Sequence, residues 1–185
     1  MNLPPIIGLS GVARSGKDTV GRILNEIYDY QVVSFSEALN DALYALNPIV
    51  LTWPMQRDYR WVLDNHGYED AKEIPEVRRL LQHMGTEVGR KFFGQNVWVD
   101  ALFARIPEGQ RTAITNVRFP NEYDAVHAHH GQVWRVHRPG FEASNGHISD
   151  TALDNHTFDA VLENNTDVAG LAQHVNEQME WILNG

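Results

Sequence analysis

Three residues near the start of the chain have the spacing that phosphate chemistry needs. Gly11, Gly16 and Lys17 fit the pattern G-x-x-x-x-G-K. The glycines allow the backbone to bend so that successive N–H groups point at one anion, and the N-terminus of a following helix adds partial positive charge there. A lysine at that point reaches the outer phosphate oxygens. The spacing therefore predicts a loop that binds nucleotide phosphates.

The next position departs from the common pattern, which has Ser or Thr there. Asp18 occupies it, and the hydroxyl is displaced to Thr19. A carboxylate is a hard oxygen ligand that suits Mg²⁺, while the hydroxyl can bind either the metal or the α-phosphate, and the pattern leaves both assignments open. We expect Arg14 to face the γ-phosphate. The expected ATP contacts are Gly11, Ala13, Arg14, Ser15, Gly16, Lys17, Asp18 and Thr19, with Mg²⁺ at Asp18 or Thr19.

The elements that must position this loop alternate between strands and helices. A short apolar run precedes the loop, and Val20, Ile23, Leu24 and Ile27 recur at helical spacing after it. Such alternation predicts a mostly parallel sheet covered by helices on both faces. The expected strands are 6–9, 31–35, 112–117, 132–136 and 158–162; helical spacing covers 17–28, 38–43, 75–93, 97–106, 122–130 and 168–183, and residues 47–65 give no clear pattern.

Composition limits the classes of partner. The formal net charge of −9 argues against a protein that grips nucleic acid through its phosphates, and the absence of cysteine excludes disulfides and thiolate metal sites. No signal peptide or membrane span is recognisable, so we expect a cytoplasmic protein that binds small nucleotides. The chain is expected to form one domain, 1–185, with a substrate-side cover at about 45–75 and a lid-like loop at about 138–156.

Several short patches together resemble the bacteriophage-type deoxynucleoside monophosphate kinases, a family of P-loop kinases. They run in order along the chain: S-G-V-A-R-S-G-K-D-T at 10–19, R-R-L-L-Q at 78–82, G-T-E at 85–87, N-V-R-F-P-N-E at 116–122, V-H-R-P-G at 136–140 and H-I-S-D at 147–150. The resemblance implies a three-layer P-loop kinase fold with about five strands. It also implies ATP with Mg²⁺, deoxynucleoside monophosphate acceptors, and a homodimer.

Phosphoryl transfer mainly requires that two polyanions be held in line while their charge is neutralised, and arginine suits this because its planar fork holds phosphate bidentately. Arg118 follows an expected strand, at the sheet edge where ligands bind, and is our first candidate for the acceptor phosphate; a salt bridge to Glu122 is the alternative. Arg138, at the start of the lid-like loop, is a candidate catalytic residue. The alternative is that it is a solvated residue at the end of a strand. Lys17, Arg14, Arg118 and Arg138 form the expected catalytic set.

The remaining acceptor candidates depend on the family pattern. It places Arg79 at the monophosphate, Asn40 where some relatives have a lysine near the substrate, and His147 in the loop after the fourth strand; Arg90 is a weaker candidate. Glu122 or Glu87 would hold a sugar hydroxyl or base edge, although a solvated helix carboxylate is the more common finding. Asn116 replaces the aspartate that relatives often carry, so the metal must rely on phosphates, Asp18 or another acid.

These observations predict transfer of the γ-phosphate of ATP to a deoxynucleoside monophosphate. Two alternatives remain open from the sequence: a P-loop kinase for another small acceptor, such as dephospho-coenzyme A, and a non-catalytic regulatory protein that binds ATP. A switch GTPase would share the phosphate loop but should carry an Asn-Lys-x-Asp motif, which this sequence lacks.

Overall fold

The computed structural model describes residues 3–141 and 151–184. The chain divides into two compact units. One is built from residues 1–34 and 105–185 and contains the main sheet, and we call it the sheet unit. The other, residues 35–104, is mostly helical, and we call it the helical unit.

The sheet unit contains the predicted α/β architecture. Its five strands are β1 (Ile6–Ser10), β2 (Gln31–Val33), β5 (Thr112–Ile114), β6 (Gln132–His137) and β7 (Ala160–Glu163). They run parallel in the order β2-β5-β1-β6-β7. β1 lies at the centre, and all five of its residues are buried. The phosphate loop, residues 11–16, therefore leaves the sheet at the carboxyl end of its central strand.

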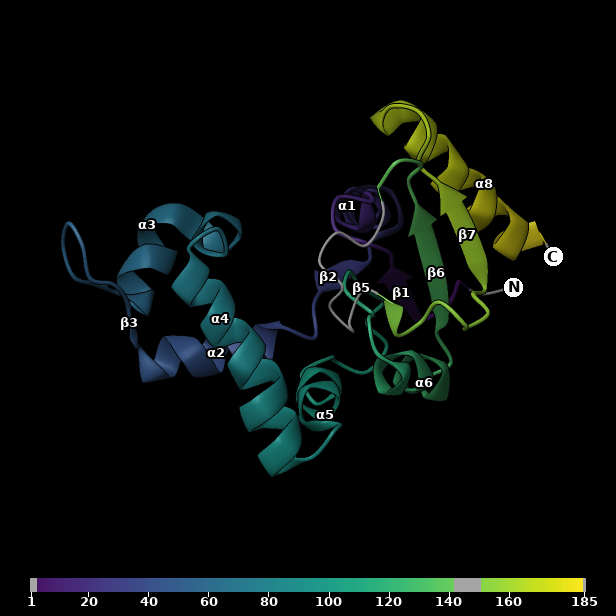
Figure 1. Ribbon diagram of the computed structural model, residues 1–185. Coiled ribbons are helices and arrows are strands. Elements are labelled where there is room, and N and C mark those ends of the chain that lie inside the picture. Colours follow the sequence, from purple (N-terminus) through teal and green to yellow (C-terminus); the bar gives the residue numbers. More distant parts are fainter. Residues whose placement is uncertain (1–2, 142–150, 185) are drawn as a thin grey trace. The chain divides into compact units, whose positions relative to one another are not determined.

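Helices cover both faces of this sheet, which gives three layers (Figure 1). α1 (Lys17–Tyr28) and α8 (Val168–Asn184) pack on one face, where the main core lies around Leu9, Trp134 and Met179. α6 (Pro120–Ala128) packs against β1 and β6 on the other face. The sequence predicted α1 at these same bounds because its apolar residues recur at a helical period.

The helical unit includes residues 47–65, for which no clear pattern was found in the sequence. It contains α2 (Glu37–Leu46), α3 (Tyr59–Ala71), α4 (Pro75–His83), α5 (Val97–Phe103) and a two-stranded hairpin of β3 (Ile49–Leu51) and β4 (Arg57–Asp58). The Asp58 side chain caps α3 by accepting from the Trp61 N–H. A core of Leu39, Leu43, Tyr59, Val62, Val77 and Leu81 holds these elements together.

The helix predicted over 75–93 is not uniform. α4 ends at His83 and continues as η1 (Met84–Phe93), a π-helix. Two contacts accompany the wider turn: the Thr86 hydroxyl donates to Gln82 O, and the Trp98 indole N–H donates to Gly85 O. Side-chain bonds of this kind compete with the regular helical ladder.

Candidate functional site

The phosphate loop has a backbone that most residues would not adopt. φ is positive at Gly11 (149°), Arg14 (63°) and Gly16 (106°). A Cβ at Gly11 would lie only 2.5 Å from Val136 O and 2.7 Å from Ser15 Oγ, so glycine is required there for space as well as for conformation. Arg14 has no such freedom, and a left-handed arginine stores strain of about 1–2 kcal/mol.

Lys17 lies inside this loop. Its side chain reaches back over the loop, so that Nζ donates to Gly11 O at 2.8 Å and to Val12 O at 2.7 Å, and the residue is only 7% exposed. A planar peptide points its N–H away from its C=O. Holding these two carbonyls therefore turns the N–H groups of Val12 and Ala13 in the opposite direction.

Two further features of the loop indicate that it can bind an anion. Ser15 is fully buried, and in the part of the chain that the structure describes its Oγ has no hydrogen-bond partner. The N-cap residue of α1 is Gly16, which has no side chain to accept from the first-turn N–H groups. A polyphosphate supplies acceptors for the hydroxyl and for these donors, so the residues present fit ATP phosphates.

Arg138, predicted to serve in catalysis, contacts the phosphate loop. Its guanidinium Nη1 donates to Arg14 O at 3.2 Å, and its Cζ lies 4.3 Å from the ring centroid of Phe141. The structure therefore brings Arg14, Lys17 and Arg138 together around one loop. His147, also predicted, lies outside the described residues.

Arg118 follows β5 at the same edge of the sheet. The Val117 N–H donates to Leu9 O at 3.0 Å, which brings Arg118 beside the end of β1. Glu122 is 4% exposed, and its Oε2 accepts the N–H groups of Arg118 at 2.8 Å and Phe119 at 3.1 Å. The expectation of a solvated carboxylate is therefore wrong for Glu122, because its oxygen caps the start of α6. Glu87, by contrast, is an exposed partner of Lys91.

Arg79 lies in the helical unit with its charge already paired. Nε donates to Glu76 Oε2 at 2.8 Å and Nη2 to Glu76 Oε1 at 2.7 Å. These hydrogen bonds, and the attraction between the charges, lower the pKa of Glu76 and raise the pKa of Arg79. An acceptor phosphate at Arg79 would have to compete with this carboxylate.

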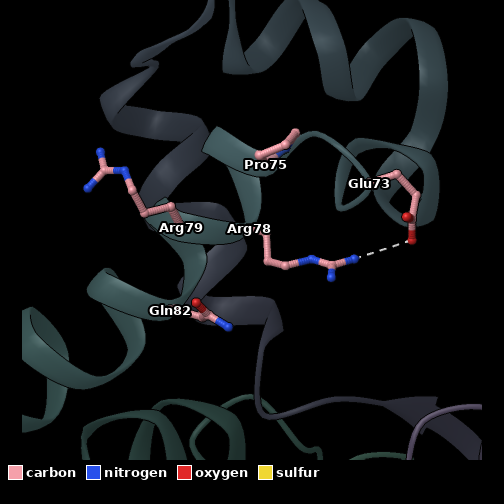
Figure 2. Close-up of a pocket in the computed structure, with 5 residues that line it drawn as sticks. All are labelled: Glu73, Pro75, Arg78, Arg79 and Gln82. Atoms are coloured by element: carbon pink, nitrogen blue, oxygen red, sulfur yellow. Dashed lines mark hydrogen bonds and ion pairs between the residues drawn. The ribbon is translucent and has the colours of Figure 1, made fainter. Parts of the chain in front are cut away.

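A pocket of about 250 Å³ lies beside Arg79, lined by Glu73, Pro75, Arg78, Arg79 and Gln82. Figure 2 shows that Arg78 extends toward Glu73, with which it forms an ion pair, and that Arg79 extends the opposite way. Both guanidiniums therefore have carboxylate partners on the helical unit.

The two other candidates of the helical unit are partly buried. Arg90 lies in η1. Asn40 lies in α2, where its Oδ1 accepts from the hydroxyl of Tyr59. Burial raises the pKa of Tyr59 to about 12, so this hydroxyl stays protonated and can donate across the neutral range.

Two residues near the phosphate loop were missed by the sequence prediction. Asn164, directly after β7, donates from Nδ2 to Ser15 O at 2.8 Å. Arg135 in β6 donates to the hydroxyl of Ser10 at 3.3 Å and pairs with Asp154 at 3.2 Å. A signal existed for Asn164, because polar residues that follow parallel strands gather at the ligand-binding edge.

A metal would find few protein ligands at this loop. No group of three or more His, Cys, Asp or Glu side chains that could hold a metal ion occurs within 3–141 and 151–184. Asp18 is exposed in the first turn of α1, and Thr19 follows it. One carboxylate and one hydroxyl fit Mg²⁺, which takes most of its ligands from phosphates and water at such sites.

Comparison with known proteins identifies the family. The model of the family "Deoxynucleotide monophosphate kinase" matches residues 62–175. The chain belongs to this family. A protein of Acanthamoeba polyphaga mimivirus described as "Putative deoxynucleotide monophosphate kinase" is 25% identical, over 86% of this chain and 88% of its own. The chain is therefore a nucleotide kinase, a phosphotransferase, and the resemblance drawn from the sequence is confirmed.

Solved structures confirm the fold class of this nucleotide kinase. Shikimate kinase from Acinetobacter baumannii in complex with shikimate has a TM-score of 0.50 and 13% identity, covering 99% of this chain and 94% of that one. A gluconokinase from Sinorhizobium meliloti 1021 has a TM-score of 0.50 and 15% identity, covering 100% and 98%. The predicted P-loop kinase fold is thus confirmed. None of the described helices is long and apolar enough to cross a membrane.

Proposed function

We propose that this kinase transfers the γ-phosphate of ATP to a deoxynucleoside monophosphate, giving the deoxynucleoside diphosphate and ADP. The observation that carries the proposal is the position of Lys17. Its ammonium group is held by Gly11 O and Val12 O at the carboxyl end of β1, inside a loop whose shape depends on Gly11 and Gly16. Family membership supports the choice of acceptor.

On the ATP side, the phosphates would lie in the phosphate loop. Lys17 would face the β- and γ-phosphates, while the backbone of Gly11, Ala13, Ser15 and Gly16 and the hydroxyl of Thr19 would contribute further donors. Arg14 would face the γ-phosphate. Mg²⁺, with Asp18 or Thr19 as its protein ligand, would neutralise phosphate charge.

On the acceptor side, Arg118 would hold the monophosphate. Its position beside the end of β1 supports this, because the phosphate loop begins there. Glu122 would serve the substrate through Arg118, whose backbone it fixes. Arg79, Arg90, Asn40 and His147 complete the proposed acceptor contacts, and the paired state of Arg79 implies that substrate phosphate displaces Glu76.

Catalysis in this scheme is electrostatic and needs no covalent intermediate. Lys17, Arg14, Arg118 and Arg138 stabilise negative charge as it redistributes over the transferred phosphoryl group. Arg138 lies at the start of the proposed lid, about 138–156, of which residues 142–150 lie outside the described residues. Closure of this lid would exclude water and suppress hydrolysis of ATP.

The proposal also covers the domain organisation, oligomeric state and location of the enzyme. We propose that residues 1–185 act as one kinase domain, that residues 45–75 contribute to the acceptor side, and that the enzyme is a cytoplasmic homodimer that takes small nucleotides and not nucleic acid. The net charge of −9 supports the last point, because nucleic-acid binding draws on excess positive charge.

An acceptor panel tests the reaction. ADP release is measured with ATP, Mg²⁺ and each deoxy- and ribonucleoside monophosphate, with dephospho-coenzyme A as an unrelated acceptor. We expect turnover with at least one deoxynucleoside monophosphate, with the diphosphate identified by chromatography. Turnover restricted to other acceptors, or none with any deoxynucleotide, would reject the proposal.

A further inference from the structure

Asn164 approaches the phosphate loop from a fixed position at the edge of the sheet. It is the first residue after β7, and its backbone N–H donates to His137 O, the last residue of β6, at 2.7 Å. From there its side-chain Nδ2 donates to Ser15 O at 2.8 Å. The contact thus joins two strand ends to a loop about 150 residues earlier in the sequence.

The space for this contact exists because residue 16 is a glycine. A Cβ at Gly16 would lie 2.6 Å from Asn164 Nδ2 and 3.3 Å from Leu171 Cδ2. Any side chain at 16 would push Asn164 away from the loop. The second glycine of the G-x-x-x-x-G-K spacing therefore serves the close packing of Asn164 as well as the left-handed backbone, whose φ is 106°.

With this contact, side chains donate hydrogen bonds to four backbone carbonyls of the phosphate loop. Lys17 binds the carbonyls of Gly11 and Val12, Arg138 binds that of Arg14, and Asn164 binds that of Ser15. Because C=O and N–H of one peptide point in opposite directions, fixing Ser15 O fixes the N–H of Gly16. That N–H immediately precedes Lys17 and the first turn of α1.

We propose that Asn164 is a positioning residue for nucleotide phosphates. It orients the Ser15–Gly16 peptide so that the Gly16 N–H faces the bound polyphosphate. The proposal rests on the proposed function only in placing a polyphosphate in the loop, and it holds for any acceptor. Asparagine suits the role because its amide donates a hydrogen bond without adding charge beside a polyanion.

The sequence offers a matched pair of variants. Asn164→Asp keeps the size of the side chain, removes the donor to Ser15 O and adds a negative charge. Asn165→Asp makes the same charge change one residue further on, at an exposed position. Asn164→Ala removes the hydrogen bond to Ser15 O without adding charge. It is therefore sufficient to test the proposal if Asn164→Asp does not fold.

Binding of ATP and of inorganic tripolyphosphate, each with Mg²⁺, is measured by calorimetry well below the unfolding temperature. We expect Kd for both ligands to rise about tenfold in Asn164→Asp and several-fold in Asn164→Ala, because the loop loses a hydrogen bond that orders it. Asn165→Asp should stay within about twofold of the wild type for both ligands, because substitutions at exposed positions usually have small effects. A purely structural role would lower the Tm without this selective loss of phosphate affinity.

Two results would overturn the inference. If both Asn164 variants bind tripolyphosphate with the affinity of the wild type, Asn164 does not orient the phosphate loop. If ATP binding weakens and tripolyphosphate binding does not, Asn164 acts on the nucleoside. A wild-type protein that binds ATP but phosphorylates no deoxynucleotide would refute the proposed acceptor while leaving this inference intact.

Discussion

The carboxylate of Glu122 holds the backbone of Arg118. Oε2 accepts the Arg118 N–H at 2.8 Å and the Phe119 N–H at 3.1 Å, and the side chain is almost completely buried. The bond fixes the turn between β5 and α6, and this turn carries the arginine proposed to bind the acceptor. In the proposed function, helix capping and acceptor binding are therefore coupled at this turn.

Removing the Glu122 carboxylate should affect stability and acceptor binding together. Glu122→Ala leaves two partly buried N–H groups without their acceptor, and we expect a loss of about 1–3 kcal/mol in the free energy of unfolding, with a raised acceptor KM. Glu122→Gln keeps an amide oxygen that can accept, so its loss should be smaller. Denaturant unfolding and steady-state kinetics measure both effects. Equal losses in the two variants would contradict the capping role.

Replacing Arg118 itself separates two modes of action. Arg118→Ala should lower kcat/KM for the acceptor by about 10- to 100-fold, the range expected for a lost charge-assisted hydrogen bond, and should leave ATP affinity unchanged. A change in acceptor KM alone means ground-state binding, whereas a fall in kcat means action in the transition state. Unchanged values of both would remove Arg118 from the site.

Lys17→Ala should abolish phosphoryl transfer. A preorganised charge at the transferred group contributes a factor of about 10² or more to the rate, and alanine supplies none. The fold should persist, because β1 and α1 are held by the core around Leu9 and Leu24. Circular dichroism checks the fold and ADP release the activity. Transfer at the wild-type rate would refute the proposed role of the phosphate loop.

Stability should fall at high pH because of two buried tyrosines. Burial raises the pKa of Tyr30 to about 12, and burial likewise raises the pKa of Tyr59 to about 12. The fold favours the protonated form of each ring. Their contribution is therefore constant below the ordinary tyrosine pKa of about 10 and is lost as pH rises from there to about 12.

Unfolding free energies measured across pH 9 to 12 test this expectation. Tyr30→Phe should flatten the fall, although it also loses the hydrogen bond from Tyr30 to Pro4 O and so lowers stability at neutral pH. Tyr59→Phe should flatten it likewise and release the side chain of Asn40. A fall of the same steepness in both variants would mean that other groups cause it.

Two glycines of η1 should respond oppositely to alanine. A Cβ at Gly89 would lie 2.3 Å from Trp98 Cζ2, so Gly89→Ala should destabilise the helical unit by about 1–3 kcal/mol through overpacking. A Cβ at Gly85 would meet only Leu39 Cδ2, at 3.5 Å, so Gly85→Ala is the control and should be neutral or slightly stabilising. Thermal unfolding compares them, and similar Tm values would refute the packing argument.

Local pattern predicted the elements of the sheet unit well. α1 has the predicted bounds, and all five strands form where apolar runs were found. The inner strands β1 and β5 are buried along their whole length, as expected in a parallel sheet, whereas the edge strands β2 and β7 are mostly exposed. β5 is shorter than its predicted range. Beyond Ile114 the chain still donates from Thr115 to Val33 O and from Val117 to Leu9 O, but it turns toward α6.

Features that depend on residues far apart in the sequence could not be predicted from local pattern. The π-helix η1 packs against Trp98, which fills the space beside Gly89, and no helical period reveals such a contact. The burial of Glu122 depends on the turn that precedes it. Asn164 contacts Ser15 because β6 and β7 pair; its position after a strand indicates the ligand-binding edge but not which residue it contacts.

The sheet unit is built from two segments, 1–34 and 105–185, that are separated in the sequence by the helical unit, and this affects how the chain folds during synthesis. β1 pairs with β5 and β6, and β2 pairs with β5, so neither early strand has a partner until residue 112 has been made. The helical unit, one continuous segment from 35 to 104, is translated and emerges from the ribosome ahead of β5. We expect it to fold first, while β1 and β2 are still without their partner strand. The phosphate loop, although it is translated before the helical unit, would then acquire its shape only after that unit has folded.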